Sequence, residues 1–168
     1  MAQDSKTMAN LQEAFAGESQ ANRKYLAFAK QADAEGFTQA AKLFRAAAEA
    51  ETVHAHAHLK VMGGINSTKE NLREAIDGET HEFKSMYPQM IAEAEKEENA
   101  QAVRTFKFAN EVEKVHAGLY TKALEALGQE GSVFDYFVCS ICGHTVEKAA
   151  PEKCMVCGAG SKAFFQVS

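Results

Sequence analysis

The chain carries the pair glutamate-x-x-histidine twice, each time inside the same local sequence. The two pairs are Glu51 and His54 in FRAAAEAETVHA, and Glu113 and His116 in FKFANEVEKVHA. The two segments agree at 7 of 12 positions with an offset of 62 residues, so they form an internal repeat. Residues three apart share one face of a helix, so each pair presents a carboxylate and an imidazole together. Helical bundles bind a pair of metal ions with such side chains, and the repeat therefore predicts a dinuclear metal site.

Each half of the repeat adds one more acid, Glu18 in the first half and Glu79 in the second. Both follow a glycine and precede a hydroxyl residue, at an offset of 61 residues. Burying an ionised carboxylate costs several kcal/mol, and four acids that converge would repel one another. Bound cations remove this cost, and carboxylate with imidazole suits iron or manganese. A single acid of this kind would more simply line a solvated helix face, but the repeated set favours metal binding.

Three further residues lie near these acids in the helical pattern. Glu82 is an additional ligand candidate, because Glu79-x-x-Glu82 supplies a second acid where the other half has one. The alternative for Glu82 is an exposed position on the helix face. Tyr25 lies two turns beyond the lone acid of the first half, and Tyr120 lies one turn beyond His116. Their phenols are placed to donate hydrogen bonds to ligand carboxylates, with ordinary core packing as the alternative.

All four cysteines fall in two Cys-x-x-Cys pairs near the C-terminus, Cys139 with Cys142 and Cys154 with Cys157. A glycine follows the second cysteine of each pair and permits a tight turn around a metal. In a protein that is not exported, this spacing indicates metal ligation and not disulfides. Four thiolates in tetrahedral geometry select zinc or a single iron. Taken alone, the motif favours a structural zinc.

Four helix-length segments must position the acids and histidines. Apolar residues recur at helical spacing over residues 5–34, 37–62, 69–97 and 99–127. Gly63 and Gly64 end the second segment, and Ser67 with Glu70 predicts a capping box for the third. Pro88 removes one backbone hydrogen bond from the third segment and should kink it.

These segments predict an all-α four-helix bundle over residues 1–130, made of two helical hairpins related by a pseudo-twofold. A short linker over 128–134 then leads to a small cysteine domain over 135–168. With 168 residues and 46% hydrophobic content, the chain is long enough to bury a sizeable core.

The charge pattern excludes some partners. The net charge of −5 gives no support to nucleic-acid binding, which needs clustered Lys and Arg. The first residues lack a basic segment followed by an apolar one, and no uncharged run approaches the length of a membrane-spanning helix. We therefore expect a cytoplasmic protein that binds neither nucleic acid nor membrane.

The motifs resemble those of the rubrerythrin family, in that family's order and over nearly the whole chain. They are GESQANRKY (17–25), AEAETVHA (48–55), GETHEF (78–83), EKVHAGLY (113–120) and the cysteine knuckles CSIC and CMVC. The resemblance implies a ferritin-like di-iron bundle followed by a rubredoxin-like domain with one iron bound by four cysteines. Ser140 and Met155 stand where many relatives have proline. Neither of these departures changes a ligand residue.

The resemblance also implies roles for individual residues. Glu51 and Glu113 become bridging carboxylates, and Glu18 and Glu79 become terminal ligands on the two irons. His116 becomes the imidazole ligand of one iron.

On the other iron, His54 and Glu82 become alternative ligands, the histidine on reduction and the glutamate on oxidation. The single iron would be held by Cys139, Cys142, Cys154 and Cys157.

Members of this family act as peroxide reductases, so the resemblance implies reduction of hydrogen peroxide to water in oxidative-stress defence. Electrons would come from reduced nicotinamide through an external reductase or a rubredoxin, and the cysteine iron would relay them. The family pattern further implies a homodimer in which the cysteine domain of one subunit serves the helical site of the other. Two alternatives stay open, namely a ferritin-like ferroxidase that uses dioxygen and a non-enzymatic zinc protein.

Overall fold

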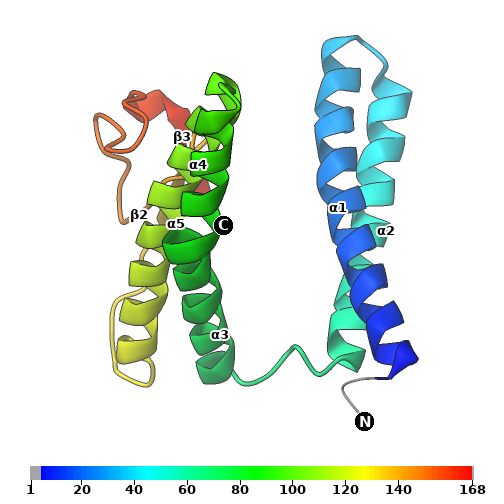
Figure 1. Cartoon of the computed structure of the whole chain (residues 1–168), viewed down its shortest axis with the longest axis horizontal. Helices are drawn as coiled ribbons and strands as arrows, with labels where there is room; N and C mark the ends of the chain where they lie inside the picture. Colours follow the sequence, from blue (N-terminus) through cyan, green and yellow to red (C-terminus); the bar gives the residue numbers. More distant parts are fainter. Residues whose placement is uncertain (1–4, 168) are drawn as a thin grey trace. The chain divides into compact units, whose positions relative to one another are not determined.

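The computed structural model describes residues 5–167, which are mainly helical (Figure 1). In chain order the helices are α1 (Lys6–Ala34), α2 (Thr38–Val61), α3 (Thr68–His81), α4 (Tyr87–Lys96) and α5 (Ala100–Ala126). A π-helical segment, η1 (Glu82–Met86), joins α3 directly to α4. The helical segments that the sequence predicts are therefore confirmed, with the third divided by η1.

Local signals set the ends of these helices. The Ser67 hydroxyl accepts a hydrogen bond from the Glu70 backbone N–H, and the Glu70 carboxylate accepts one from the Ser67 backbone, so the predicted capping box of α3 is present. Gly63, just after α2, has φ +75°, a left-handed conformation that glycine adopts without strain. Helix α1 is capped by Ser5, whose hydroxyl accepts from the Met8 backbone N–H at 3.1 Å.

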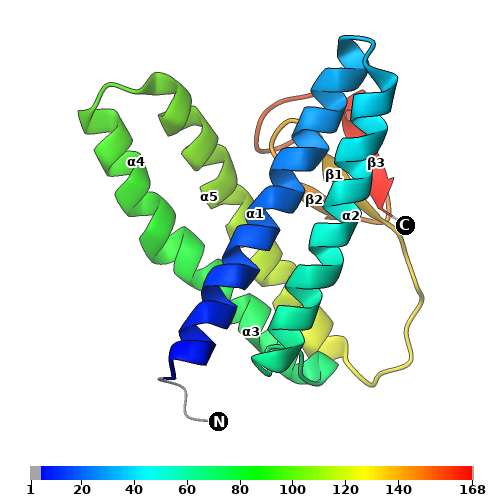
Figure 2. The same ribbon diagram turned by 90° about the vertical axis from the view of Figure 1, so that its right-hand side faces the viewer.

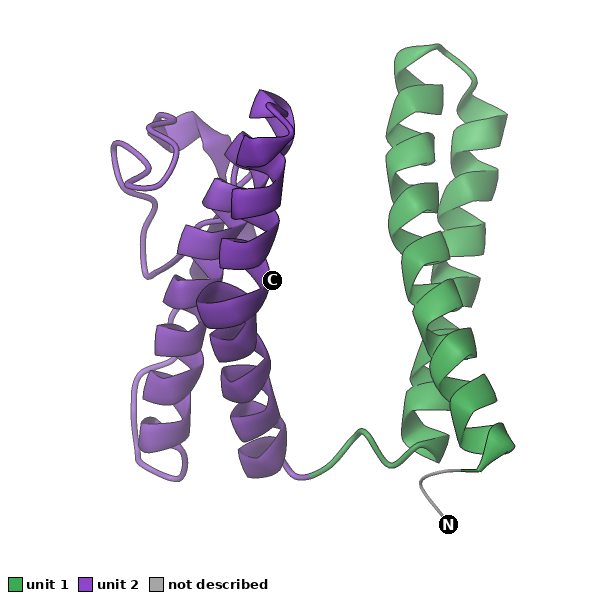
Figure 3. Cartoon of the chain, in the orientation of Figure 1, with its two compact units in different colours: residues 1–66 green, residues 67–168 purple. Residues whose placement is uncertain are grey.

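The chain divides into two compact units, residues 1–66 and 67–168 (Figure 3). In the first unit, α1 and α2 lie side by side and run in opposite directions, as Figures 1 and 2 show. Ala41, Ala48 and Ala55, spaced seven residues apart on α2, are 0%, 0% and 6% exposed. Such small side chains on one face let two helices approach closely. The hairpin is therefore built on an alanine seam.

The second unit holds α3, η1, α4, α5 and a small three-stranded antiparallel sheet. Its strands β1 (Tyr136–Cys139), β2 (Thr145–Glu147) and β3 (Phe164–Val167) are arranged in the order β2-β1-β3. Strand β2 contacts α5. A Cβ atom added at Gly143 would lie 3.7 Å from a methyl carbon of Val112 on α5, and Lys122 of α5 forms an ion pair with Glu147. The cysteine-bearing sheet is thus packed on α5 of its own chain.

The predicted fold class, a helical region followed by a small cysteine domain, is confirmed. Its predicted division into residues 1–130 and 135–168 stays a prediction. None of the helices within residues 5–167 combines the length and the apolar character that a membrane span needs.

Pro88 explains the interruption of the third helical rod. The Tyr87 backbone N–H donates to the Glu82 carbonyl, five residues back, where an α-helix would pair residues four apart. A proline ring collides with the carbonyl four residues before it, and widening the preceding turn relieves that collision. The sequence predicts a kink at Pro88, and the structure has a π turn just before it, a feature that often marks functional sites.

Candidate metal centres

The first unit gathers three of the predicted ligands. Glu18 on α1 and Glu51 and His54 on α2 have ligand atoms that all lie within 4.8 Å of one another. The Nδ1 atom of His54 is 3.4 Å from a carboxylate oxygen of Glu51 and 3.8 Å from one of Glu18. The His54 side chain is 55% exposed, while that of Glu51 is 17% exposed.

Asn22 fixes the position of α1 against α2 near Glu18 and Glu51. Its side-chain amide donates to the Ala48 carbonyl at 2.7 Å and to the Thr52 hydroxyl at 2.9 Å. Asn22 is one turn beyond Glu18, and Thr52 directly follows Glu51. These two hydrogen bonds therefore hold the acids of α1 and α2 at the same level.

The second unit gathers the equivalent residues, Glu79 on α3 with Glu113 and His116 on α5, again within 4.8 Å. The Nδ1 atom of His116 is 2.7 Å from a carboxylate oxygen of Glu113 and 3.7 Å from one of Glu79. This triad is better shielded, since the His116 side chain is 25% exposed. In both units Nδ1 faces the two carboxylates, so the sequence repeat is also a repeat of ligand geometry.

The acids in each triad are close enough to oppose each other's ionisation. The pKa of Glu18 is raised by a hydrogen bond with Glu51, by burial and by the Glu51 charge. The pKa of Glu79 is raised from 4.5 to about 7 by burial and by the nearby charges of Glu113 and Glu82. Carboxylates that resist ionisation together lack a positive partner, which a bound cation supplies. The donor set of two carboxylates and one imidazole fits iron or manganese.

Glu82 does not complete the second triad in the described part of the chain. It lies close enough to raise the pKa of Glu79, but its carboxylate falls outside the cluster of atoms within 4.8 Å. Glu82 is half-buried and is the first residue of η1, so it belongs to the part of the rod that departs from α-helical geometry.

Of the two predicted tyrosines, Tyr120 lies near the acids and Tyr25 packs among aromatic rings. The pKa of Tyr120 is raised by burial and by the charges of Glu79 and Glu113. The ring of Tyr25 has its centroid 6.2 Å from that of Phe44 and 6.3 Å from that of Phe28. The ring of Tyr25 thus packs against aromatic side chains, and a hydrogen bond from its hydroxyl to a ligand carboxylate stays a prediction.

Sequence reasoning missed Tyr87. Its pKa is raised by burial and by Glu113, Glu82 and Glu79, which places its phenol near the acids of the second unit. In an uninterrupted α-helix, Tyr87 would lie about 80° around the axis from Glu79. Only the wider π turn changes this angle, and Pro88 was the one signal of that turn in the sequence.

The four cysteines form a compact cluster in the second unit. The sulfur atoms of Cys139 and Cys157 are 3.7 Å apart, and those of Cys142 and Cys154 are 3.6 Å apart. A tetrahedral metal with bonds of about 2.3 Å to sulfur requires sulfur–sulfur separations of about 3.8 Å. The cluster therefore already has the dimensions of a tetrahedral metal site.

Backbone amides prepare these sulfur atoms for a metal. Burial raises the pKa of the Cys142 thiol, and the backbone N–H of His144 opposes that rise. Burial disfavours the Cys154 thiolate, but the N–H groups of Cys157 and Val156 outweigh it and lower the pKa of Cys154 to about 7. Gly143, with φ +84°, supplies the left-handed turn that the sequence predicts after Cys142.

Comparison with known families agrees with both kinds of site. The helical region, residues 9–124, matches the family model described as Rubrerythrin. Residues 137–165 match the model described as the rubredoxin-like domain of rubrerythrin. Together these matches include every predicted acid, histidine and cysteine ligand.

Curated relatives cover most of the chain. Rubrerythrin of Porphyromonas gingivalis is 36% identical, over 96% of this chain and 90% of its own length. Nigerythrin of Nitratidesulfovibrio vulgaris is 34% identical over 94% and 87%, and Rubrerythrin-2 of Clostridium acetobutylicum is 32% identical over 88% and 89%.

Solved structures of nigerythrin give the same result. The partially reduced and the fully reduced, all-ferrous states each match with a TM-score of 0.59 at 33% identity, over 99% of this chain and 92% of theirs. The chain thus has the residues of a di-iron centre and of a single iron bound by four cysteines, as its sequence predicts. Duplicated acid and histidine triads, a tetracysteine cluster and both family matches lead to one conclusion: the chain belongs to the rubrerythrin family.

Proposed function

We propose that this protein is a non-haem di-iron peroxide reductase that converts hydrogen peroxide to water with electrons from an external donor. The observation that carries the proposal is the presence of two matching Glu-Glu-His triads together with a tetracysteine site in one chain. A protein that only stores or oxidises iron has no need of a second, sulfur-ligated metal. The rubrerythrins and nigerythrin among its relatives support an oxidoreductase function.

In this proposal the two triads serve one dinuclear centre. Each triad offers three ligands, and bridging carboxylates let two ions share the set. Glu51 and Glu113 would be the bridging acids, and Glu18 and Glu79 would be terminal ligands.

The histidines would complete the set: His116 would hold one ion, and His54 and Glu82 would be alternative ligands of the other. Glu82 is suited to that role, because it lies near Glu79 yet outside the cluster. The helical region 1–130 then acts as the catalytic domain, and residues 135–168 act as the electron-relay domain.

The chain's own groups have defined tasks. When bound, iron supplies two electrons that, with two protons, convert one molecule of hydrogen peroxide into two molecules of water. The carboxylates of Glu18, Glu51, Glu79 and Glu113 balance the positive charge of the bound ions. The phenols of Tyr87 and Tyr120 stay protonated near Glu79 and Glu113, because burial and negative charge raise their pKa. They are therefore available as hydrogen-bond donors beside the carboxylates.

We further propose that the cysteine-bound iron takes electrons singly from a reductase or a rubredoxin, with reduced nicotinamide as their origin. The protein would work as a homodimer in the cytoplasm, in defence against peroxide. The tetracysteine site suits this role, since iron bound by four thiolates exchanges single electrons without changing its ligands.

The test is peroxide-dependent oxidation of NADH in the presence of a reductase and the iron-loaded protein. Glu113→Gln should lower the rate at least about 10-fold, because even residues behind the ligands cost that much in metal sites. Glu111→Gln is the matched control, since Glu111 lies on the same helix and is exposed. Equal activity of both variants would contradict the assignment.

A second measurement separates the proposal from its alternatives. The fully reduced protein should be reoxidised much faster by hydrogen peroxide than by dioxygen in a stopped-flow experiment. Faster reaction with dioxygen would favour a ferroxidase. A colourless protein that contains zinc at every site and lacks peroxidase activity would favour a structural role.

A further inference from the structure

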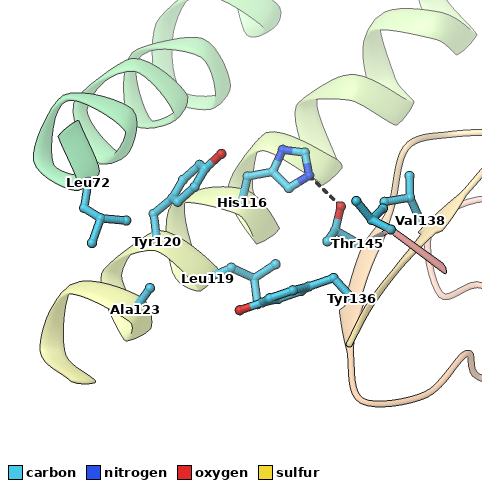
Figure 4. Close-up of a pocket in the computed structure, with 9 residues that line it drawn as sticks. Leu72, His116, Leu119, Tyr120, Ala123, Tyr136, Val138 and Thr145 are labelled. Atoms are coloured by element: carbon cyan, nitrogen blue, oxygen red, sulfur yellow. Dashed lines mark hydrogen bonds between the residues drawn. The ribbon is translucent and has the colours of Figure 1, made fainter. Parts of the chain in front are cut away.

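An apolar pocket lies beside the metal ligands of the second unit. Its volume is about 380 Å³, and it is lined by side chains of α3, α5 and the sheet (Figure 4). All of its lining residues fall within residues 72–167, so one compact unit forms the pocket. Five of them have side chains made only of hydrocarbon: Leu72, Leu119, Ala123, Val138 and Val167.

The imidazole of His116 forms a wall that the pocket shares with the metal site. Its Nδ1 atom is 2.7 Å from a carboxylate oxygen of Glu113. Its Nε2 atom is 2.9 Å from the hydroxyl oxygen of Thr145 on β2, which also lines the pocket (Figure 4). The ring is therefore held on both sides, with the acids at one nitrogen atom and the pocket beside it.

Tyr120 is the second residue that the pocket shares with the surroundings of the acids. Burial and the negative charges of the second triad raise the pKa of its phenol, which therefore stays protonated and able to donate a hydrogen bond. In Figure 4 the phenol oxygen of Tyr120 and the ring of His116 lie at the same end of the pocket, and Leu119 and Ala123 lie towards the other end. The pocket thus has a polar end beside the metal ligands and a hydrocarbon end away from them.

The size of this pocket exceeds what hydrogen peroxide needs. One water molecule occupies about 30 Å³ in the liquid, so a molecule with two oxygen atoms needs roughly 60 Å³. The pocket, at about 380 Å³, is several times larger. Pockets of this size that combine apolar walls with a few polar groups are typical of sites for organic molecules. A hydrocarbon chain gains free energy by leaving water for such walls, whereas hydrogen peroxide has no chain to bury.

We propose that this pocket binds the hydrocarbon chain of an alkyl hydroperoxide, so that organic hydroperoxides are substrates in addition to hydrogen peroxide. The inference rests on the proposed function, because it names a second substrate class for the same centre. The O–O bond breaks, two electrons from the external donor and two protons are taken up, and one alcohol and one water are released. The chain lies against Leu119 and Ala123, and the hydroperoxide group lies at the end formed by His116 and Tyr120.

The first test measures binding without turnover. The product alcohol has the same chain as the hydroperoxide but no O–O bond, so its affinity for the oxidised, iron-loaded protein can be measured by isothermal titration calorimetry. Burying one methylene group strengthens binding by up to about 4-fold. We therefore expect 1-hexanol, with four more methylene groups than ethanol, to bind at least about 10-fold more tightly. Equal affinity for the two alcohols would overturn the proposal.

The second test fills the hydrocarbon end of the pocket. Ala123→Phe places a ring where the chain would lie, so 1-hexanol affinity should fall at least about 10-fold. The ratio of kcat/KM for n-hexyl hydroperoxide to kcat/KM for hydrogen peroxide should fall by a similar factor. Ala126→Phe is the matched control, since Ala126 is exposed on the same helix, and it should keep the native values.

A graded variant separates filling from misfolding. Ala123→Met fills less of the pocket and should give losses between those of the native protein and Ala123→Phe, with an unchanged iron–thiolate spectrum. Native alcohol affinity and a native kcat/KM ratio in Ala123→Phe would overturn the proposal.

The outcomes also distinguish this inference from the proposed function. Native protein that reduces hydrogen peroxide but neither binds 1-hexanol nor reduces n-hexyl hydroperoxide would overturn the inference and leave the proposed function standing. Protein that reduces neither peroxide, yet binds 1-hexanol in the native form and not as Ala123→Phe, would overturn the proposed function while supporting the pocket as a site for a hydrocarbon chain.

Discussion

At the scale of single residues, the two triads share one geometry but differ in shielding. His116 is 25% exposed and hydrogen-bonded to Thr145, whereas His54 is 55% exposed. The ring of His116 is therefore held by a contact on each of its two nitrogen atoms within its own unit.

The raised pKa of Glu79 predicts a pH dependence of the metal-free protein. Its pKa in the folded state is about 7, above its ordinary value of 4.5, so the folded state binds a proton more tightly. The resulting stabilisation is fully present below pH 4.5 and is lost as pH rises through 7. Chemical denaturation of metal-free protein should therefore show a falling free energy of unfolding over this range, and Glu79→Gln should flatten the curve. Metal affinity should change in the opposite direction, since cations compete with the proton.

Asn22 predicts a second residue-level effect. Replacing it by alanine removes hydrogen bonds to the Ala48 carbonyl and the Thr52 hydroxyl, each worth about 1 kcal/mol. Urea denaturation should show a loss of about 1–2 kcal/mol, and metal binding by the first triad should weaken. Gln20→Ala is the control, because Gln20 is exposed on the same helix. A loss no larger than that of the control would show that Asn22 does not fix the acids.

At the scale of secondary structure, the π turn η1 lies between Glu79 of α3 and helix α4. A π turn contains one more residue than an α turn, so it rotates everything that follows it relative to Glu79. That rotation brings the phenol of Tyr87 near the acids. The turn is therefore part of the site as well as a response to Pro88.

Pro88→Ala should stabilise the protein and disturb the site. Proline inside a helix costs up to about 3 kcal/mol relative to alanine, and the variant can return η1 to α geometry. We expect a higher midpoint of urea denaturation. We also expect weaker metal binding by the triad of the second unit, measured by metal titration of the metal-free protein. A less stable variant with unchanged metal binding would contradict this account.

The helices and their ends could be predicted from sequence, because capping and periodicity are local properties. The Ser67–Glu70 capping box spans three residues, and the ligand spacing within α2 and α5 spans one turn. The contribution of Tyr87 could not be predicted, since it depends on five-residue hydrogen bonding that only tertiary packing selects. Nor could the partner of His116, because a contact across 29 residues depends on how the sheet docks on α5.

At the scale of the whole molecule, the cysteine sheet is too small to be stable without its metal. Its strands are only three or four residues long, and sheets of this size need further support to persist in water. A bound metal contributes directly to the folding of such a domain. The tetracysteine site therefore maintains the surface that carries Thr145 as well as binding its metal.

Removing that metal should unfold one part of the chain selectively. With Cys142→Ser or a strong chelator, amide hydrogens of β1 to β3 should exchange rapidly while those of α1 and α2 stay protected. Hydrogen exchange with mass spectrometry measures this difference, and restoring metal to the chelated native protein is the control. Continued protection of the strands without metal would contradict the prediction.

The alanine seam of α2 has a consequence for the fidelity of folding. Because Ala41, Ala48 and Ala55 repeat every seven residues, sliding α2 by one repeat along α1 still meets small side chains and displaces Glu51 from Glu18 by about 10.5 Å. Hydrocarbon contacts alone distinguish poorly between these two registers. A polar side chain with only one set of matching partners makes the choice, much as a single buried asparagine sets the alignment of a coiled coil. The hairpin thus trades some packing energy for a unique alignment.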